Sequence, residues 1–225
     1  MKNNYAEIAF VLDRSGSMDS CRDAAIEGFN CFLKEQQQVE GLAKLTLVLF
    51  DDEYLVPAQA LPVAEVIPLD DETYVPRGST ALLDAIGRTI DEMGVRLAAL
   101  PEADRPAQVI VATLTDGAEN SSQNYTWHQL AGVIRRQTEQ YRWTFLFLGA
   151  NQDAIATAAQ MNIAAANAAN YVHDEPGLHA SSKAIGRKVR ALRSFQMSSG
   201  TLEERADERA SLSDLLAEED RKERS

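Results

Sequence analysis

Cysteine and long apolar runs are both scarce in this sequence of 225 residues. The two cysteines, Cys21 and Cys31, fall in one predicted helix, where a separation of about 15 Å puts them beyond disulfide reach. Two free thiols indicate a reducing compartment. The apolar run before Asp13 is too short for a signal-peptide core, and no run approaches the ~18 residues of a membrane span. We therefore expect a cytoplasmic protein with no membrane partner.

Histidine and basic residues are also scarce. The three histidines, His128, His173 and His179, are scattered, and neither cysteine lies near them in the sequence. A nitrogen and sulfur ligand set for zinc is therefore missing. With 22 basic and 34 acidic residues, the formal net charge is −12. That balance argues against nucleic acid as a partner, because binding a phosphate backbone needs a basic face.

Several catalytic and nucleotide-binding motifs are missing as well. The sequence contains neither Gly-x-Gly-x-x-Gly nor Gly-x₄-Gly-Lys-Ser/Thr, which excludes the common phosphate-binding loops. The residues around Ser15 and Ser17 do not form the Gly-x-Ser-x-Gly elbow of a serine hydrolase. No histidine follows the apolar strands at 6–12, 45–50, 54–60, 107–114 or 143–148 in the role of a base. These absences leave few routes to nucleotide or acyl-transfer chemistry.

What is present is a regular alternation of apolar strands and amphipathic helices. The strands at 107–114 and 143–148 are continuously apolar, which is typical of parallel strands that are covered on both faces. Two further strands flank the acidic turn at 51–53 and predict an antiparallel hairpin at one edge. The predicted strands span 6–12, 45–50, 54–60, 107–114, 143–148 and 169–172, and the predicted helices span 20–39, 80–97, 126–138, 153–161 and 181–195. The pattern predicts an α/β fold with a doubly wound, mostly parallel central sheet flanked by helices, and one antiparallel edge strand.

The last part of the chain has a different composition. Residues 199–225 are rich in charge and hold few large apolar side chains, which predicts a flexible tail or a marginal helix. We therefore expect one domain over residues 1–198, including the helix at about 181–195, followed by that tail. The basic residues of this helix are interpreted as a solvated face that balances an acidic body; they are Lys183, Arg187, Lys188, Arg190 and Arg193.

Oxygen-bearing side chains follow the predicted strands at one edge of the sheet. The segment Asp13-Arg14-Ser15-Gly16-Ser17 follows the first strand, and Thr115-Asp116-Gly117 follows the strand at 107–114. A third segment, at 77–80, ends in Thr80 and leads into a helix. In doubly wound sheets the loops after the strands meet at the carboxyl edge. Oxygen ligands alone select hard cations, so Mg²⁺ is expected, with Mn²⁺ or Ca²⁺ as alternatives.

This pattern resembles the metal-ion-dependent adhesion site (MIDAS) of von Willebrand factor A domains, in its compact bacterial and phage-associated form. The resemblance spans residues 5–173 and includes the segment 147–153 after the late strand. It implies a Rossmann-like fold in which Ser15, Ser17 and Thr80 bind the ion directly. Asp13 and Asp116 would act mostly through bound water. One coordination position would remain for a Glu or Asp carboxylate of a partner protein.

The resemblance also implies a function. It favours a non-enzymatic, Mg²⁺-dependent adaptor whose partners include AAA-type ATPases or proteins of stress-response and phage-related operons. The alternative is a metal-dependent phosphatase or phosphotransferase of the haloacid dehalogenase type, with Asp13 as nucleophile. That chemistry needs a second Asp two residues on, where this sequence has Ser15. A further hypothesis is that a carboxylate of residues 212–223 reaches the ion and mimics the partner.

Overall fold

The computed structural model describes residues 1–150, 153–196 and 200–225. The strands are β1 (Lys2–Asp13), β2 (Leu42–Phe50), β3 (Tyr54–Pro62), β4 (Pro106–Thr115), β5 (Thr144–Gly149) and β6 (Ala168–Asn170). The helices are α1 (Arg22–Gln38), α2 (Leu82–Ala98), α3 (Trp127–Tyr141), α4 (Ala154–Gln160), α5 (Glu175–Gln196), α6 (Leu202–Arg209) and α7 (Leu212–Glu223). Short 3₁₀ segments are η1 (Gly16–Cys21), η2 (Val63–Glu65), η3 (Glu102–Asp104) and η4 (Ala165–Asn167).

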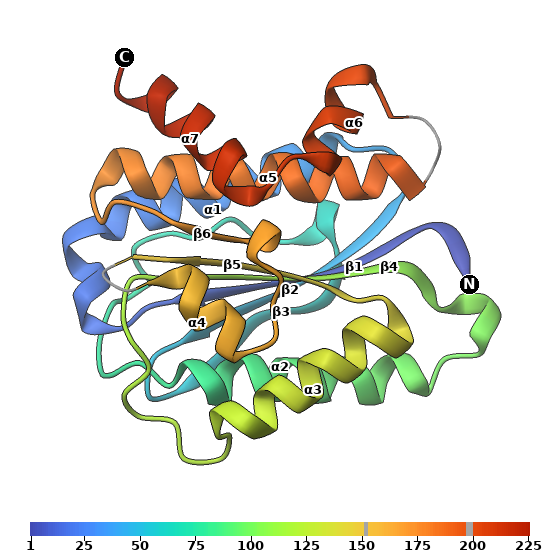
Figure 1. The fold of residues 1–225 in the computed structure, drawn as a ribbon, viewed down its shortest axis with the longest axis horizontal. Coiled ribbons are helices and arrows are strands. Elements are labelled where there is room, and N and C mark those ends of the chain that lie inside the picture. Colours follow the sequence, from blue (N-terminus) through green and yellow to red (C-terminus); the bar gives the residue numbers. More distant parts are fainter. Residues whose placement is uncertain (151–152, 197–199) are drawn as a thin grey trace.

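The strands form one sheet in the order β3-β2-β1-β4-β5-β6. β2 and β3 pair antiparallel at one edge, and the other neighbouring strands pair parallel. Helices α1, α5 and α7 cover one face, and α2, α3 and α4 lie on the other (Figure 1). The fold class predicted from the sequence, a doubly wound and mostly parallel sheet with one antiparallel edge strand, is confirmed.

The alternation of side chains along β1 divides the core into two layers. Ile8, Phe10 and Leu12 join the apolar cluster under α1 and α5, whereas Ala9 and Val11 join the cluster under α2 and α3. Both sides of β1 are therefore fully buried, which explains why its sequence is continuously apolar. The same burial on both faces holds β1 rigidly in the middle of the sheet, and its last residue is Asp13.

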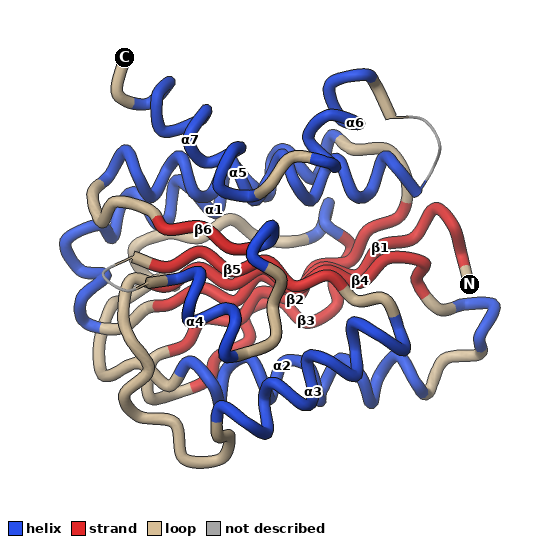
Figure 2. Tube along the Cα trace, in the orientation of Figure 1, coloured by secondary structure: helices blue, strands red, loops and turns tan. Residues whose placement is uncertain are grey.

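The carboxyl ends of the parallel strands lie at one edge, where the connecting loops gather (Figure 2). The backbone joins these loops to one another. The N–H of Arg14 donates to the carbonyl of Phe50 at 2.8 Å, and the N–H of Ala150 donates to that of Thr115 at 3.1 Å. Thr80 lies in a loop, because helix α2 begins at Leu82 and not at residue 80 as the periodicity predicts.

The C-terminal segment differs from the flexible tail that its composition predicts. Residues 202–209 and 212–223 form α6 and α7, and Leu212, Leu215 and Leu216 of α7 lie buried in the main apolar cluster. The spacings of three and one put the three leucines on a single face of α7. That apolar face is enough to pack a helix of this length against the main apolar cluster. The apolar residues of this segment are few, but their spacing on one helix face is what allows α7 to pack against the domain. The expected boundary at residue 198 lies outside the described residues.

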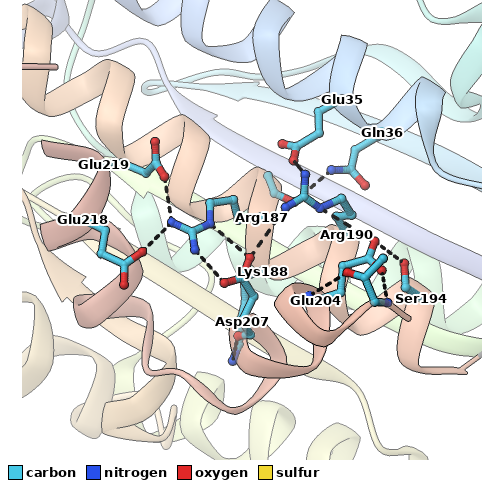
Figure 3. Close-up of polar contacts among 12 residues, drawn as sticks. Glu35, Gln36, Arg187, Lys188, Arg190, Ser194, Glu204, Asp207, Glu218 and Glu219 are labelled. Atoms are coloured by element: carbon cyan, nitrogen blue, oxygen red, sulfur yellow. Dashed lines mark hydrogen bonds and ion pairs between the residues drawn. The ribbon is translucent and has the colours of Figure 1, made fainter. Parts of the chain in front are cut away.

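The basic residues of α5 are not a solvated face, and that interpretation is wrong for most of them. Arg187 contacts Asp207 at 2.6 Å and Glu219 at 2.7 Å, and all three side chains are largely buried (Figure 3). Lys188 is 5% exposed and donates to backbone carbonyls at the end of α6. These cations are balanced by acids from the C-terminal helices, which the sequence places 20–32 residues further on.

In the described part of the chain, no helix has the length and apolar character needed to cross a membrane. Thr126 and Gln129 form a capping box at the start of α3. Of the segment at 147–153 that takes part in the resemblance, residues 151–152 lie outside the described ranges.

Candidate metal centre

The five predicted metal-site residues lie at one edge of the sheet. Asp13 ends β1, and the parallel register pairs Leu12 with Leu114 of β4, so the segments that follow these two strands are neighbours. The hydroxyl group of Thr115 donates to Asp13 Oδ2, which joins the two strand ends through their side chains. Asp13 and Asp116 are both fully buried. The two carboxylates therefore face a shared, desolvated edge.

The two serines of the Asp-x-Ser-x-Ser segment lie beside these carboxylates. Ser15 Oγ is 3.2 Å from Ser17 Oγ, and the Ser17 hydroxyl donates to Asp116 Oδ1 at 2.8 Å. The backbone N–H of Ser15 donates to Asp13 Oδ1 at 2.6 Å, so the carboxylate itself shapes the turn that presents the serines. Two oxygens about 3 Å apart have the spacing of neighbouring ligands around an ion bound at ~2.1 Å from each.

Thr80 reaches the same edge from the loop before α2. Its backbone is held by Asn120, which accepts from Thr80 N–H at 2.9 Å and donates its own N–H to the Thr80 carbonyl at 3.1 Å. A Cβ atom placed on Gly117 would lie 2.9 Å from Thr80 Oγ1. Glycine at this position therefore allows the threonine hydroxyl to lie directly against the residue that follows Asp116.

The electrostatics of this edge favour a cation. Burial raises the pKa of Asp13 to about 6, partly offset by the hydrogen bonds from Thr115 and Ser15, and the neighbouring Asp116 raises it further. A buried carboxylate that is costly to ionise becomes less so when a cation lies beside it. The edge therefore gains most from an ion that balances both carboxylates at once.

The one basic residue inside the motif does not supply that balance. Arg14 is buried, and its guanidinium contacts Asp51 at 2.9 Å and Glu53 at 3.4 Å in the turn between β2 and β3. Arg77 contacts the same turn, with Glu53 at 2.9 Å. The acidic turn thus engages both arginines that flank the predicted ligands, and it leaves the hydroxyl edge to another cation.

Some residues that support the site were not recognised from the sequence. Glu119, in the loop after Asp116, accepts hydrogen bonds from the N–H groups of Leu83 and Ser122. Asp84, in the first turn of α2, accepts hydrogen bonds from the backbone N–H groups of residues 123–125. Both acids fasten the loop after Asp116 to the start of α2. The contacts that join the two segments span 36 residues for Glu119 and 39–41 residues for Asp84, so no local pattern identifies them.

The donor set fits a hard divalent cation. Asp13, Ser15, Ser17, Thr80 and Asp116 offer only carboxylate and hydroxyl oxygens. Among the described residues, no group of three or more His, Cys, Asp or Glu side chains is placed to hold a metal. An ion at this edge would therefore depend on the hydroxyl groups, which is the donor chemistry that suits Mg²⁺ and related oxygen-binding cations.

No protein-family model matches the chain, and no curated protein matches it either. Solved structures do. A von Willebrand factor type A protein from Catenulispora acidiphila matches with a TM-score of 0.56 and 16% identity, covering 82% of this chain and 42% of that one. The proximal thread matrix protein 1 from the mussel byssus, with a zinc-occupied MIDAS motif, matches with a TM-score of 0.55 and 15% identity. The match covers 83% of this chain and 46% of that one. The ArnB paralog VWA2 from Sulfolobus acidocaldarius matches with a TM-score of 0.52 and 16% identity, covering 81% of this chain and 44% of that one.

Together, the sheet order and its helical layers define a doubly wound α/β domain with a polar edge built from carboxylates and hydroxyls. Within that class, the structural matches show that the chain has the fold of a von Willebrand factor A domain, as the sequence predicted. The chain spans less than half the length of these three structures. At such low identity they show the fold alone.

Proposed function

We propose that this chain is a divalent-cation-dependent protein-interaction module. The observation that carries the proposal is the convergence of three separate loops on one edge, where Ser15, Ser17 and Asp116 form a continuous hydrogen-bonded row beside Thr80. These part-buried hydroxyl and carboxylate oxygens lie within hydrogen-bond distance of one another, and the flanking arginines pair with the acidic turn, which together support a cation at this edge.

The proposed site holds the ion through neutral ligands. Ser15, Ser17 and Thr80 would supply hydroxyl oxygens, and the carboxylates of Asp13 and Asp116 would act through bound water. Because hydroxyl ligands leave the charge of a dication largely uncompensated, the ion keeps a strong affinity for an anionic oxygen. A Glu or Asp carboxylate of a partner protein would complete the coordination.

Mg²⁺ is the ion that we propose, with Mn²⁺ and Ca²⁺ as alternatives. The mussel byssus protein holds zinc at its MIDAS motif, which supports a divalent cation in general and not Mg²⁺ in particular. In this chain the five candidate ligands are all oxygens, and hard cations with oxygen coordination suit that set best.

The rival proposal, a phosphatase or phosphotransferase with Asp13 as nucleophile, has less support. Asp13 is fully buried, and its two oxygens accept hydrogen bonds from the Ser15 N–H and the Thr115 hydroxyl. A nucleophilic carboxylate needs an oxygen that can approach the substrate. Phosphate release from generic phosphomonoesters, abolished by Asp13→Asn, would favour this rival.

The first test measures binding of the ion by calorimetric titration of purified protein with Mg²⁺. We expect one site in the wild-type chain and no binding in the double variant Ser15→Ala/Ser17→Ala. Ser213→Ala, a half-buried serine of α7, is the matched control and should bind as the wild type does. Equal binding by the double variant and the wild type would show that the ion does not use these hydroxyls.

The second test concerns the partner. Affinity capture in the native host's extract with Mg²⁺ present should recover a protein that EDTA releases and that Asp13→Ala fails to retain. Substituting single Glu and Asp residues of that protein by Ala should then identify the carboxylate that reaches the ion. AAA-type ATPases are among the partners that we propose. Partners that survive both EDTA and Ser15→Ala/Ser17→Ala would contradict the proposal.

A further inference from the structure

His173 lies beside the candidate metal site, and no role is predicted for it from the sequence. It follows strand β6 and precedes helix α5, and its side chain is 18% exposed. Its Nε2 atom lies 3.1 Å from the hydroxyl oxygen of Ser20 and 3.5 Å from Asp116 Oδ2. The ring therefore faces Oδ2 of Asp116, whereas Oδ1 of the same carboxylate accepts the hydrogen bond from the Ser17 hydroxyl.

The surroundings of the ring indicate which nitrogen carries the proton. A neutral imidazole has one N–H donor and one acceptor nitrogen. Among the described residues, Nδ1 is buried without a hydrogen-bond partner, whereas Nε2 faces the two oxygens of Ser20 and Asp116. A buried N–H at Nδ1 would have no acceptor, so the proton belongs on Nε2. His173 then carries an N–H that faces Ser20 Oγ at 3.1 Å and, at the longer distance of 3.5 Å, the Asp116 carboxylate.

We propose that His173 is a positioning residue of the metal site. Its Nε2–H holds Oδ2 of Asp116, so that Oδ1 keeps the hydrogen bond that it accepts from Ser17. The inference rests on the proposed function, because it assigns a role toward the same ion. Groups that orient a ligand in this way commonly change metal affinity by about 10–100-fold when they are removed.

The loop that carries His173 is itself held on both sides. The Tyr171 N–H donates to the carbonyl of Gly149 at 3.1 Å, which ties the loop to β5. On the other side, Asp174 accepts from the Gly177 N–H at 2.8 Å and forms a two-point ion pair with Arg224, each contact at 2.9 Å. The imidazole is therefore presented by a fixed turn, as a positioning role requires.

A direct nitrogen ligand is the competing role for His173. Binding a metal through Nε2 would move the proton to Nδ1, where no acceptor is present among the described residues. The two roles differ in metal preference. A nitrogen ligand would favour Zn²⁺ strongly over Mg²⁺, whereas a hydrogen bond to Asp116 should change the affinity for both ions by a similar factor.

Calorimetric titration with Mg²⁺ and with Zn²⁺ separates these roles. We expect His173→Ala to weaken both ions by about 10-fold or more. His173→Gln, whose amide N–H can replace Nε2–H, should recover most of that affinity. His128→Ala, an exposed histidine of α3, is the control and should bind as the wild type does. Unchanged binding by His173→Ala, no recovery by His173→Gln, or a loss confined to Zn²⁺ would each overturn the positioning role.

The tautomer of His173 can be measured in the metal-free wild-type protein. This measurement does not depend on whether a substituted chain folds. Imidazole ¹⁵N NMR shifts should show the proton of His173 on Nε2, and a proton on Nδ1 would overturn the inference. A wild-type chain that binds neither ion would overturn the proposed function and this inference together. Equal binding by wild type and His173→Ala would overturn this inference alone.

Discussion

The carboxyl edge of the sheet and the C-terminal helical face both bury acidic side chains, but they surround them differently. At the edge, Asp13 and Asp116 lie among hydroxyl groups, and nearby Arg14 is engaged by Asp51. On the helical face, Arg187 lies against two largely buried acids of α6 and α7 (Figure 3). Charges balanced within the chain fasten one element to another, whereas carboxylates lined with hydroxyls suit an ion from solution.

The largest effect that we predict is on the helical face. Arg187→Ala should lower the free energy of unfolding by about 3–5 kcal/mol, because it leaves buried carboxylates without their cation. Urea denaturation measures the loss. Arg221→Ala, an exposed arginine of α7, is the matched control and should be close to neutral.

Arg187→Ala also tests whether the helical face and the metal edge differ in what their acidic side chains do. Mg²⁺ affinity of folded Arg187→Ala should stay near that of the wild type, since the contacts it loses lie among α5, α6 and α7. A loss of stability below about 1 kcal/mol would mean that this pair is worth no more than an exposed one. The contrast between the regions would then fail.

An intermediate effect is predicted at the metal edge. Mg²⁺ at about 100 times its dissociation constant should stabilise the wild-type chain by about 2.7 kcal/mol. Asp13→Asn should abolish this gain, yet at pH 8 without metal it should be at least as stable as the wild type. The reason is that burial raises the pKa of Asp13 to about 6, so its ionised form is costly in the folded state.

Thermal unfolding of both chains with and without Mg²⁺ measures these two results. Arg221→Ala again serves as the control and should gain as much from Mg²⁺ as the wild type does. A metal-free Asp13→Asn protein that unfolds well below the wild type would show that Asp13 stabilises the fold itself.

The sequence predicted the sheet and the candidate ligands because both depend on local signals. The continuous apolar strand at 107–114 requires burial on both faces, and β4 confirms it. Asp13, Ser15 and Ser17 stand two residues apart at a strand end, where the fold sets their direction. Chain order then places the loops of Thr80 and Asp116 at the same edge.

What the sequence could not predict depends on contacts between distant segments. The docking of α7 follows from three leucines that gain meaning only against the surface of α5 and β6. His173 was one histidine among three, and its place beside Asp116 arises from the position of the β6–α5 turn. Composition alone made residues 212–223 resemble a solvated tail, although they belong to the packed domain.

The smallest predicted effect links the two regions. Arg224, at the end of α7, contacts Asp174, the residue next to His173. Arg224→Ala should leave urea denaturation nearly unchanged, because exposed ion pairs contribute little to stability. It should still weaken Mg²⁺ binding by less than His173→Ala does, since the turn that presents the imidazole loses one of its two anchors. Calorimetry beside Arg221→Ala measures the difference, and equal affinities in the two variants would mean that the helical face and the metal edge act independently.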